Sequence, residues 1–147
     1  MPAEFQIHDG TIMIYPTRPG SWGKDRSGAL RAFGDIFIEI LKRENLYILA
    51  DKEHFYEAKD FVDRLIYEEV LKKRHARCVG SAPDVTDPLK DFDGDELKEI
   101  LEERCLILPI DSDDAWARDV GPTFLVKDRM DIRAVNWNFN AWGGEYN

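Results

Sequence analysis

The sequence predicts an α/β fold in which a sheet carries flanking helices. Three observations predict it: short apolar runs with the composition of strands, longer segments with apolar residues at helical spacing, and the alternation of the two along the chain. Such alternation is typical of layered α/β sheets. The 147 residues, with 44% hydrophobic and 12% aromatic side chains, are enough for one globular domain with its own core.

The predicted strands are short runs rich in β-branched and other apolar residues. They cover residues 11–15, 46–50, 106–110, 123–126 and 132–137. The first two runs, TIMIY and LYILA, predict strands buried on both faces. Pro109 inside the third run indicates an edge strand or a strand end, because proline cannot donate to a ladder. The last two strands would form a hairpin through residues 127–131.

The predicted helices carry an apolar stripe opposite a charged face. They cover residues 29–43, 53–74 and 95–103. Ser27 and Asp51 are candidate caps for the first two. Residues 16–28 contain two prolines and three glycines and predict a loop, which carries Arg18 and Trp22. Residues 79–94 predict a second, exposed loop.

The charge and the cysteine content narrow the partners and the compartment. A net charge of −9 and a pI near 4.8 argue against nucleic acid and anionic membranes as partners, and favour a small cationic ligand. Cys78 and Cys105 are too few for a disulfide scaffold and lack zinc-ligand spacing, so we expect reduced thiols and no metal. No apolar run approaches the ~20 residues of a membrane span, and the N-terminus lacks signal-peptide features. These features predict a cytoplasmic protein.

The acidic run DFDGDELKEILE partly matches a calcium-binding loop. Its acidic residues at the first, third, fifth and twelfth loop positions are Asp91, Asp93, Asp95 and Glu102. Glu96 stands where such a loop needs glycine, and Lys98 stands where it needs an apolar residue. These departures favour the alternative that Asp93 or Asp95 caps the following helix and that the rest is a solvated acidic face.

The densest gathering of charged and aromatic side chains follows the strand at 106–110. Its members are Asp113, Asp114, Trp116, Arg118 and Asp119, with Trp137, Asn138, Asn140 and Trp142 further along. The carboxyl ends of strands are where α/β sheets build their sites. Asp119 could hold a guanidinium or amidinium through two parallel hydrogen bonds, while the Trp116 indole stacks on its flat face. The alternative is structural: Asp119 pairs with Arg118 or Arg133, and Trp116 lies in the core.

Three blocks of sequence resemble the N-terminal part of agmatine deiminases, within the wider peptidyl-arginine deiminase family. They are MPAEFQIHDGTIMIYPTRPGSW (1–22), DDAWARDVGPTFLV (113–126) and RAVNWNFNAWGG (133–144). The resemblance implies a pentein fold, a propeller-like ring of α/β modules. Residues 1–147 would then be a single partial domain, the first module and the start of the second. Residues 72–104 look atypical of the family and predict an insertion.

The resemblance also implies a reaction and two site residues. The family hydrolyses a guanidinium group: a cysteine thiolate attacks the guanidinium carbon, ammonia leaves, and water releases the ureido product, with no metal or organic cofactor. It implies that Asp119 grips a guanidinium substrate such as agmatine or an arginine and that Trp116 lines the slot. Two departures are mild: Asp113 replaces the family's usual asparagine, and Ala117 its usual methionine.

The nucleophile has no counterpart in this sequence. Neither Cys78 nor Cys105 matches the context of the family's catalytic cysteine, so the resemblance implies no catalytic residue in these 147 residues. We therefore expect an N-terminal fragment that is inactive alone, because the reaction needs a thiolate. The alternative is a non-catalytic binding or assembly module that forms a homo-oligomer through exposed strand edges.

Overall fold

The computed structural model of the chain describes residues 7, 9–112, 114–127 and 131–136. The chain divides into two compact units. The first spans Asp9–Ala115. The second combines residues 1–8 with residues 116–147, and its described part is Ile7 with residues 116–127 and 131–136. Both are small mixed arrangements of helices and strands, which agrees with the predicted α/β class.

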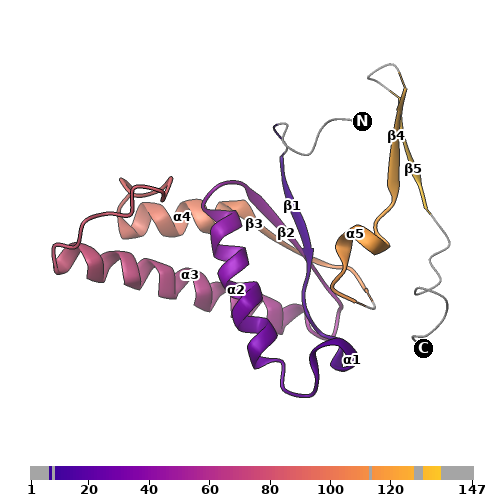
Figure 1. Cartoon of the computed structure of the whole chain (residues 1–147), viewed down its shortest axis with the longest axis horizontal. Helices are drawn as coiled ribbons and strands as arrows, with labels where there is room; N and C mark the ends of the chain where they lie inside the picture. The colour runs from indigo at the N-terminus through magenta and orange to yellow at the C-terminus, as the bar shows by residue number, and fades with distance from the viewer. Residues whose placement is uncertain (1–6, 8, 113, 128–130, 137–147) are drawn as a thin grey trace. The chain divides into compact units, whose positions relative to one another are not determined.

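The first unit is a three-stranded parallel sheet whose strands are connected by helices along the chain (Figure 1). Its elements in chain order are β1 Gly10–Ile14, α1 Pro19–Trp22, α2 Ser27–Leu41, β2 Asn45–Ala50, α3 Phe55–Cys78, α4 Gly94–Arg104 and β3 Cys105–Pro109. The strand order is β1-β2-β3, and both pairs are parallel. Parallel neighbours require crossover connections, which α2 provides between β1 and β2, and α3 with α4 between β2 and β3.

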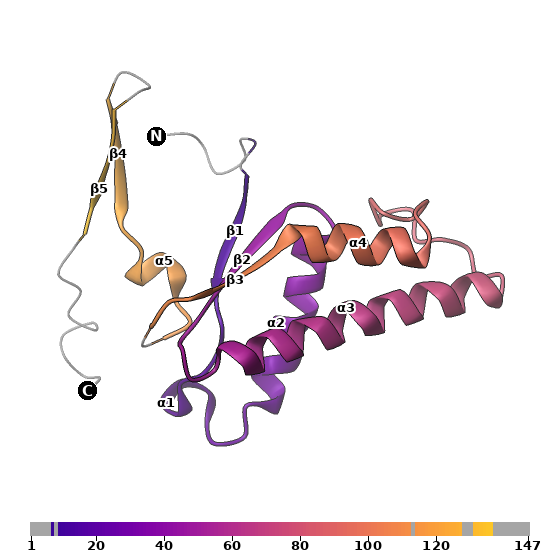
Figure 2. The same ribbon diagram turned by 180° about the vertical axis from the view of Figure 1, so that it is seen from behind.

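One face of this sheet carries the core. Along β2, Leu46, Ile48 and Ala50 alternate with less buried residues and are at most 1% exposed. The helices contribute most of the other buried side chains, which are Phe37, Ile38, Leu41, Ala58, Val62, Ile66, Val70, Leu97 and Leu101. In both views α3 and α4 run alongside each other next to the strands (Figure 1, Figure 2). Because β2 buries alternate residues, these helices cover a single face.

The opposite face of the sheet is more open than the sequence predicted. Ile12, Tyr47 and Leu106 stand in register across the three strands; Ile12 is 57% and Leu106 49% exposed, and Tyr47 is half-buried. The prediction that the first two strands are buried on both faces is therefore wrong. The physical reason is that one helical layer covers one face. Pro109 closes β3, which is an edge of the described sheet, as its position predicted.

The sequence patterns predicted the positions of the helices better than they predicted the residues at which the helices begin. Residues 16–28, predicted as a loop, contain the short helix α1 and the first two residues of α2. Ser27 is the first residue of α2 rather than its cap, and its N–H donates to Asp25 Oδ1 at 3.0 Å. Asp51 accepts the N–H of His54 at 2.8 Å, one turn before α3 begins, so it caps that turn and not the helix itself.

The polar groups around α4 form hydrogen bonds and ion pairs with other groups of the protein. Asp93 caps α4 through a capping box with Glu96, which confirms that expected alternative to calcium. Within the described residues, no group of three or more His, Cys, Asp or Glu is arranged to hold a metal. Arg77 Nη2 donates to the Phe92 carbonyl at 2.8 Å, and Arg74 pairs with Asp95 at 2.6 Å. Arg77 of α3 thus holds the 79–94 loop, and Arg74 of α3 holds the first turn of α4. That residues 72–104 are an insertion remains a prediction.

The second unit contains a short helix and a hairpin. Its elements are α5 Ala117–Val120, β4 Thr123–Lys127 and β5 Asp131–Val135, and the strands pair antiparallel with Thr123 opposite Val135. The predicted last strand, residues 132–137, is confirmed over residues 132–135; Asn136 follows the strand, and Trp137 lies outside the described residues. Every described residue of β4 is exposed. Among the described residues of both units, no helix is long and apolar enough to cross a membrane.

Candidate functional site

The predicted site residues follow β3 in the sequence. Asp114 belongs to the first unit, and Trp116, Arg118 and Asp119 belong to the second. Some predicted members lie outside the described residues; they are Asp113, Trp137, Asn138, Asn140 and Trp142. The site is therefore described as two separate clusters, one in each unit.

In the second unit, Trp116 immediately precedes the single turn of α5, and Asp119 lies within that turn. The Trp116 carbonyl accepts the N–H groups of Asp119 at 3.0 Å and Val120 at 3.2 Å, which closes the turn. Trp116 is the N-cap residue, just outside the helix, and Asp119 is the third residue of α5. Trp116 is 52% exposed and Asp119 is exposed, so an indole face and a carboxylate are both open to a ligand. The expected placement of Trp116 in the core, under the structural alternative, is not seen.

Asp119 has no ion-pair partner among the described residues. Arg133, one of its expected partners under the structural alternative, instead reaches Asp131, with Nη2 3.3 Å from Oδ2. A carboxylate open to solvent keeps its two oxygens available for a fork of two N–H donors. This arrangement suits a planar cation that can lie against an aromatic ring.

In the first unit, a buried carboxylate joins two loops at the end of the sheet. Asp114 is 8% exposed, and Ser21 Oγ lies 3.0 Å from its Oδ2 and 3.2 Å from its Oδ1. Arg18 Nη1 donates to Oδ2 at 3.4 Å, and the N–H of Ala115 donates to Oδ1 at 2.8 Å. The burial of this charge is thus compensated by a cation and by hydrogen bonds. Sequence reasoning noted Arg18 only as a loop residue and did not single out Ser21.

A second network holds the loop that carries Arg18 and Ser21. Arg26 donates to both oxygens of Glu57, at 2.9 and 3.1 Å, and to the carbonyl of Pro16 at 2.9 Å. Tyr15 donates its hydroxyl to Glu57 at 3.0 Å. Burial of Tyr15, followed by the nearby Glu57 carboxylate, raises the pKa of this phenol, so it remains a donor at neutral pH. The loop is therefore fixed to β1 and α3.

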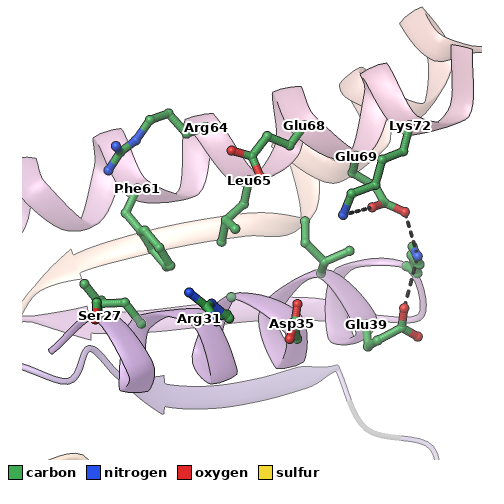
Figure 3. A pocket seen from close by; sticks show the side chains of 14 residues that line it. Ser27, Arg31, Asp35, Glu39, Phe61, Arg64, Leu65, Glu68, Glu69 and Lys72 are labelled. Atoms are coloured by element: carbon green, nitrogen blue, oxygen red, sulfur yellow. Dashed lines mark hydrogen bonds and ion pairs between the residues drawn. The ribbon is translucent and has the colours of Figure 1, made fainter. Parts of the chain in front are cut away.

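A groove between α2 and α3 contains none of the predicted site residues (Figure 3). Its volume is about 640 Å³. Leu30, Ile38, Phe61 and Leu65 are among its apolar lining, and charged side chains line the rest. At one end Lys42 Nζ lies 2.8 Å from Glu69 and 3.0 Å from Glu39. Burial opposes the charged form of Lys42, but these carboxylates outweigh it and raise the Lys42 pKa.

The two cysteines lie in different surroundings. Cys78 is the last residue of α3 and is exposed. Cys105 begins β3 and is half-buried, and burial, with a smaller contribution from Asp63, raises the pKa of its thiol to about 11. A thiol with this pKa is almost wholly protonated at neutral pH, whereas the thiolate is the nucleophile.

Comparison with known proteins places the chain in a family. The Porphyromonas-type peptidyl-arginine deiminase family matches residues 1–147. A protein of Selenomonas ruminantium described as "Putative agmatine deiminase" is 33% identical over 146 residues, 99% of this chain and 30% of the relative. An agmatine deiminase of Stutzerimonas stutzeri strain A1501 is 30% identical over 145 residues, 99% of this chain and 29% of the relative.

The match extends over both units but over a limited part of the relatives. The chain spans about 30% of the length of the curated relatives it matches, and the match corresponds to their N-terminal part. The three sequence blocks that resembled agmatine deiminases lie inside the matched residues. By the family match over its whole length, this chain belongs to the Porphyromonas-type peptidyl-arginine deiminase family.

Proposed function

We propose that this chain supplies the guanidinium-binding part of a C–N hydrolase that converts agmatine to N-carbamoylputrescine and ammonia. The observation that carries the proposal is the pairing of Trp116 and Asp119 on one exposed turn, in a chain of the deiminase family. In the proposed pentein ring, this turn would form one wall of the substrate slot. The acidic net charge of −9 also favours a cationic substrate such as agmatine or an arginine.

The proposed chemistry divides binding from attack. The Asp119 carboxylate accepts two N–H groups of the guanidinium, and the Trp116 indole stacks on its face. This fixes the carbon for attack and stabilises the positive charge. A cysteine thiolate then bonds to the carbon while one nitrogen leaves as ammonia with a proton. Water displaces the thiolate and leaves the ureido product. The reaction as proposed uses neither a metal nor an organic cofactor.

Within these 147 residues we assign no nucleophile. The raised pKa of Cys105 keeps its thiol protonated, and Cys78 is an exposed residue at the end of α3. We therefore propose that this chain alone binds its substrate without hydrolysing it. Purified protein incubated with agmatine should release no ammonia. Ammonia release that disappears in Cys78→Ala or Cys105→Ala would refute this assignment.

Calorimetry with agmatine tests the binding residues. Asp119→Asn should weaken binding about tenfold or more, since a hydrogen bond to a charged group contributes roughly 1.5–3 kcal/mol. Asp131→Asn is the matched control: it removes an exposed carboxylate from the same unit, one that pairs with Arg133, and should leave affinity unchanged. Equal affinity for the parent chain and Asp119→Asn would contradict the proposal.

A second candidate function, assembly without catalysis, rests on the open face of the first unit's sheet. Ile12 and Leu106 expose about half of their area there, and β1 and β3 are edge strands of the described sheet. Exposed apolar area of this kind favours self-association into a homo-oligomer. Sedimentation would show oligomers that dissociate in Ile12→Lys, whereas a monodisperse monomer would exclude this candidate.

A further inference from the structure

We propose that the groove between α2 and α3 is a binding site for a small zwitterion, in which a carboxylate and an ammonium group stand about one helical turn apart on an apolar chain. All residues that line the groove belong to the first unit. The inference therefore goes beyond the proposed reaction and does not depend on the residues of the second unit. The volume of the groove, about 640 Å³, lies in the range of small-molecule sites.

The floor of the groove is apolar and lies where the two helices approach each other most closely, at Gly34. A Cβ atom at position 34 would lie 2.9 Å from Leu65 Cδ2 and 3.2 Å from Phe61 Cζ, so a larger residue would force these side chains to move. Phe61 and Leu65 point from α3 towards α2 (Figure 3). Together with Leu30 they are half-buried, so part of their apolar surface remains open to a ligand. This strip suits a chain of methylene groups.

Charged side chains of both helices border the apolar strip in the same order. Arg31 of α2 and Arg64 of α3 line the groove near its Ser27 end, and Asp35 and Glu68 follow four residues later on the same two helices (Figure 3). Four residues advance an α-helix by about 6 Å. The groove therefore presents two cations and then, one turn further along, two anions.

These four charged groups are exposed and do not neutralise one another. Within the part of the chain that the structure describes, Arg31, Asp35 and Glu68 form no ion pair, and Arg64 Nε donates to the Asp60 carbonyl at 3.2 Å. Oppositely charged residues four apart on a helix pair better when the acid comes first, and on both helices the base comes first. The charges are therefore available to a ligand.

The order of the charges defines the chemistry of the ligand. A carboxylate near Arg31 and Arg64 can accept N–H groups from both guanidinium groups, which gives charge-assisted hydrogen bonds. An ammonium group about 6 Å further along can donate to Asp35 and Glu68, since it has three donors. A ligand with two anionic groups would place one of them against these carboxylates, so the site selects for one charge of each sign.

A zwitterion of this length occupies one half of the groove. At the other end Lys42 pairs with Glu39 and Glu69, so its charge is already compensated within the protein. A suitable probe is 5-aminopentanoate, which carries its carboxylate and its ammonium group at the two ends of a methylene chain. Pentanoate and pentylamine have a similar chain and each lack one of the two charges.

Amide chemical-shift titrations with these three compounds test the inference. With 5-aminopentanoate, the amides of residues 30–39 and 61–69 should shift along one saturable curve. Pentanoate and pentylamine should bind at least about threefold more weakly, because each loses the ion pairs at one end of the site. This readout locates the ligand and needs no catalytic activity.

Variants of exposed residues test the assigned contacts without disturbing the core. Arg31→Gln should weaken binding of 5-aminopentanoate about threefold or more, because one of the two carboxylate partners is lost. Lys59→Gln is the matched control, since it removes an exposed cation of α3 outside the groove, and it should leave the affinity unchanged. Arg31→Asp combined with Asp35→Arg keeps the net charge but reverses the order of charges on α2, so it should weaken binding more than Arg31→Gln does.

Four outcomes would overturn the inference. The first is the absence of saturable shifts in residues 30–39 and 61–69, and the second is equal affinity of the three compounds or of the parent and Arg31→Gln. The third is binding that is lost in Asp119→Asn, which would assign the ligand to the proposed guanidinium-binding turn and leave the proposed function standing. The fourth is self-association, seen by sedimentation, that is lost in Arg31→Gln, because a second copy of the chain would then occupy the groove.

Discussion

The two units differ in how much of their apolar surface they bury. In Asp9–Ala115, side chains from three helices and the sheet form one core, and Phe37, Leu41, Leu46 and Ile48 are fully buried. In the described part of the second unit, four large apolar side chains of β4 and β5 are at least half exposed, namely Phe124, Leu125, Val126 and Ile132. A two-stranded hairpin is at best marginally stable on its own. The stability of the chain therefore resides in the first unit.

The residues proposed to bind substrate lie in the second unit, which buries less apolar surface. The exposed turn with Trp116 and Asp119 belongs to the second unit, whereas the buried carboxylate of Asp114, with its partners Arg18 and Ser21, belongs to the first. Functional residues are often carried by exposed segments of a protein. The difference teaches that a substitution in the core of the first unit should act first on stability, and one on α5 should act first on substrate binding.

The largest expected effect that would test this contrast is on the free energy of unfolding. Phe37→Ala should lower it by about 3–5 kcal/mol, because truncating a buried phenylalanine loses transfer energy and leaves a cavity. Phe37 is 0% exposed and makes edge-on contacts with Phe33 and Phe61, at centroid distances of 5.9 and 6.5 Å. Phe124→Ala, at a 54% exposed position of β4, should change it by about 0.5 kcal/mol. Urea denaturation measures both, and equal losses would break the contrast.

The thiols give a second test of the contrast. A reactive cysteine in the first unit would mean that this unit has a chemical role as well as a structural one. A thiol reagent at pH 8 should modify the exposed Cys78 rapidly and Cys105 only after unfolding. Fast modification of Cys105 in the folded protein would contradict its half-buried position and its raised pKa.

The raised pKa of Cys105 also predicts the direction in which the free energy of unfolding changes with pH. Burial raises the pKa of Cys105 from an ordinary 9.0 to about 11, so above pH 9 the unfolded state has lost the thiol proton that the folded state keeps. The stabilising contribution is full below pH 9 and is lost as the pH rises towards 11. Other groups titrate in this range too, so the measurement is the difference between the parent and Cys105→Ala. Parallel curves between pH 8 and 11 would refute the prediction.

Local patterns predicted the elements, because strands and helices are short-range periodicities. All five strands and the three main helices were expected within a few residues, and Asp93 was expected as a cap. The exposure of Ile12 could not be predicted, because it depends on which face the helices cover. The partners of Asp114 could not be predicted either, since Ser21 and Arg18 lie 93 and 96 residues away in sequence. Nothing in the local sequence distinguishes such a carboxylate from a solvated one.

The smallest expected effect concerns the cap of α4, which is held by local bonds on the surface of the first unit. Asp93 Oδ1 accepts the N–H groups of Asp95 and Glu96 at 2.8 and 2.9 Å. Asp93→Ala leaves both donors without this acceptor and should lower the urea midpoint by far less than Phe37→Ala does. Asp93→Asn is the matched control, because asparagine is also a good N-cap, and it should keep the midpoint at pH 7.

The cap should also respond to pH in a defined direction. The N–H groups of Glu96, and then of Asp95, lower the pKa of Asp93 below its ordinary 3.8. The stabilisation from this carboxylate is therefore present above pH 3.8 and is lost as the pH falls through the lowered value. The difference in urea midpoint between the parent and Asp93→Ala should shrink on acidification below pH 3.8, while the asparagine cap keeps its effect. A difference that grows on acidification would show that α4 is held at this end by packing and not by its cap.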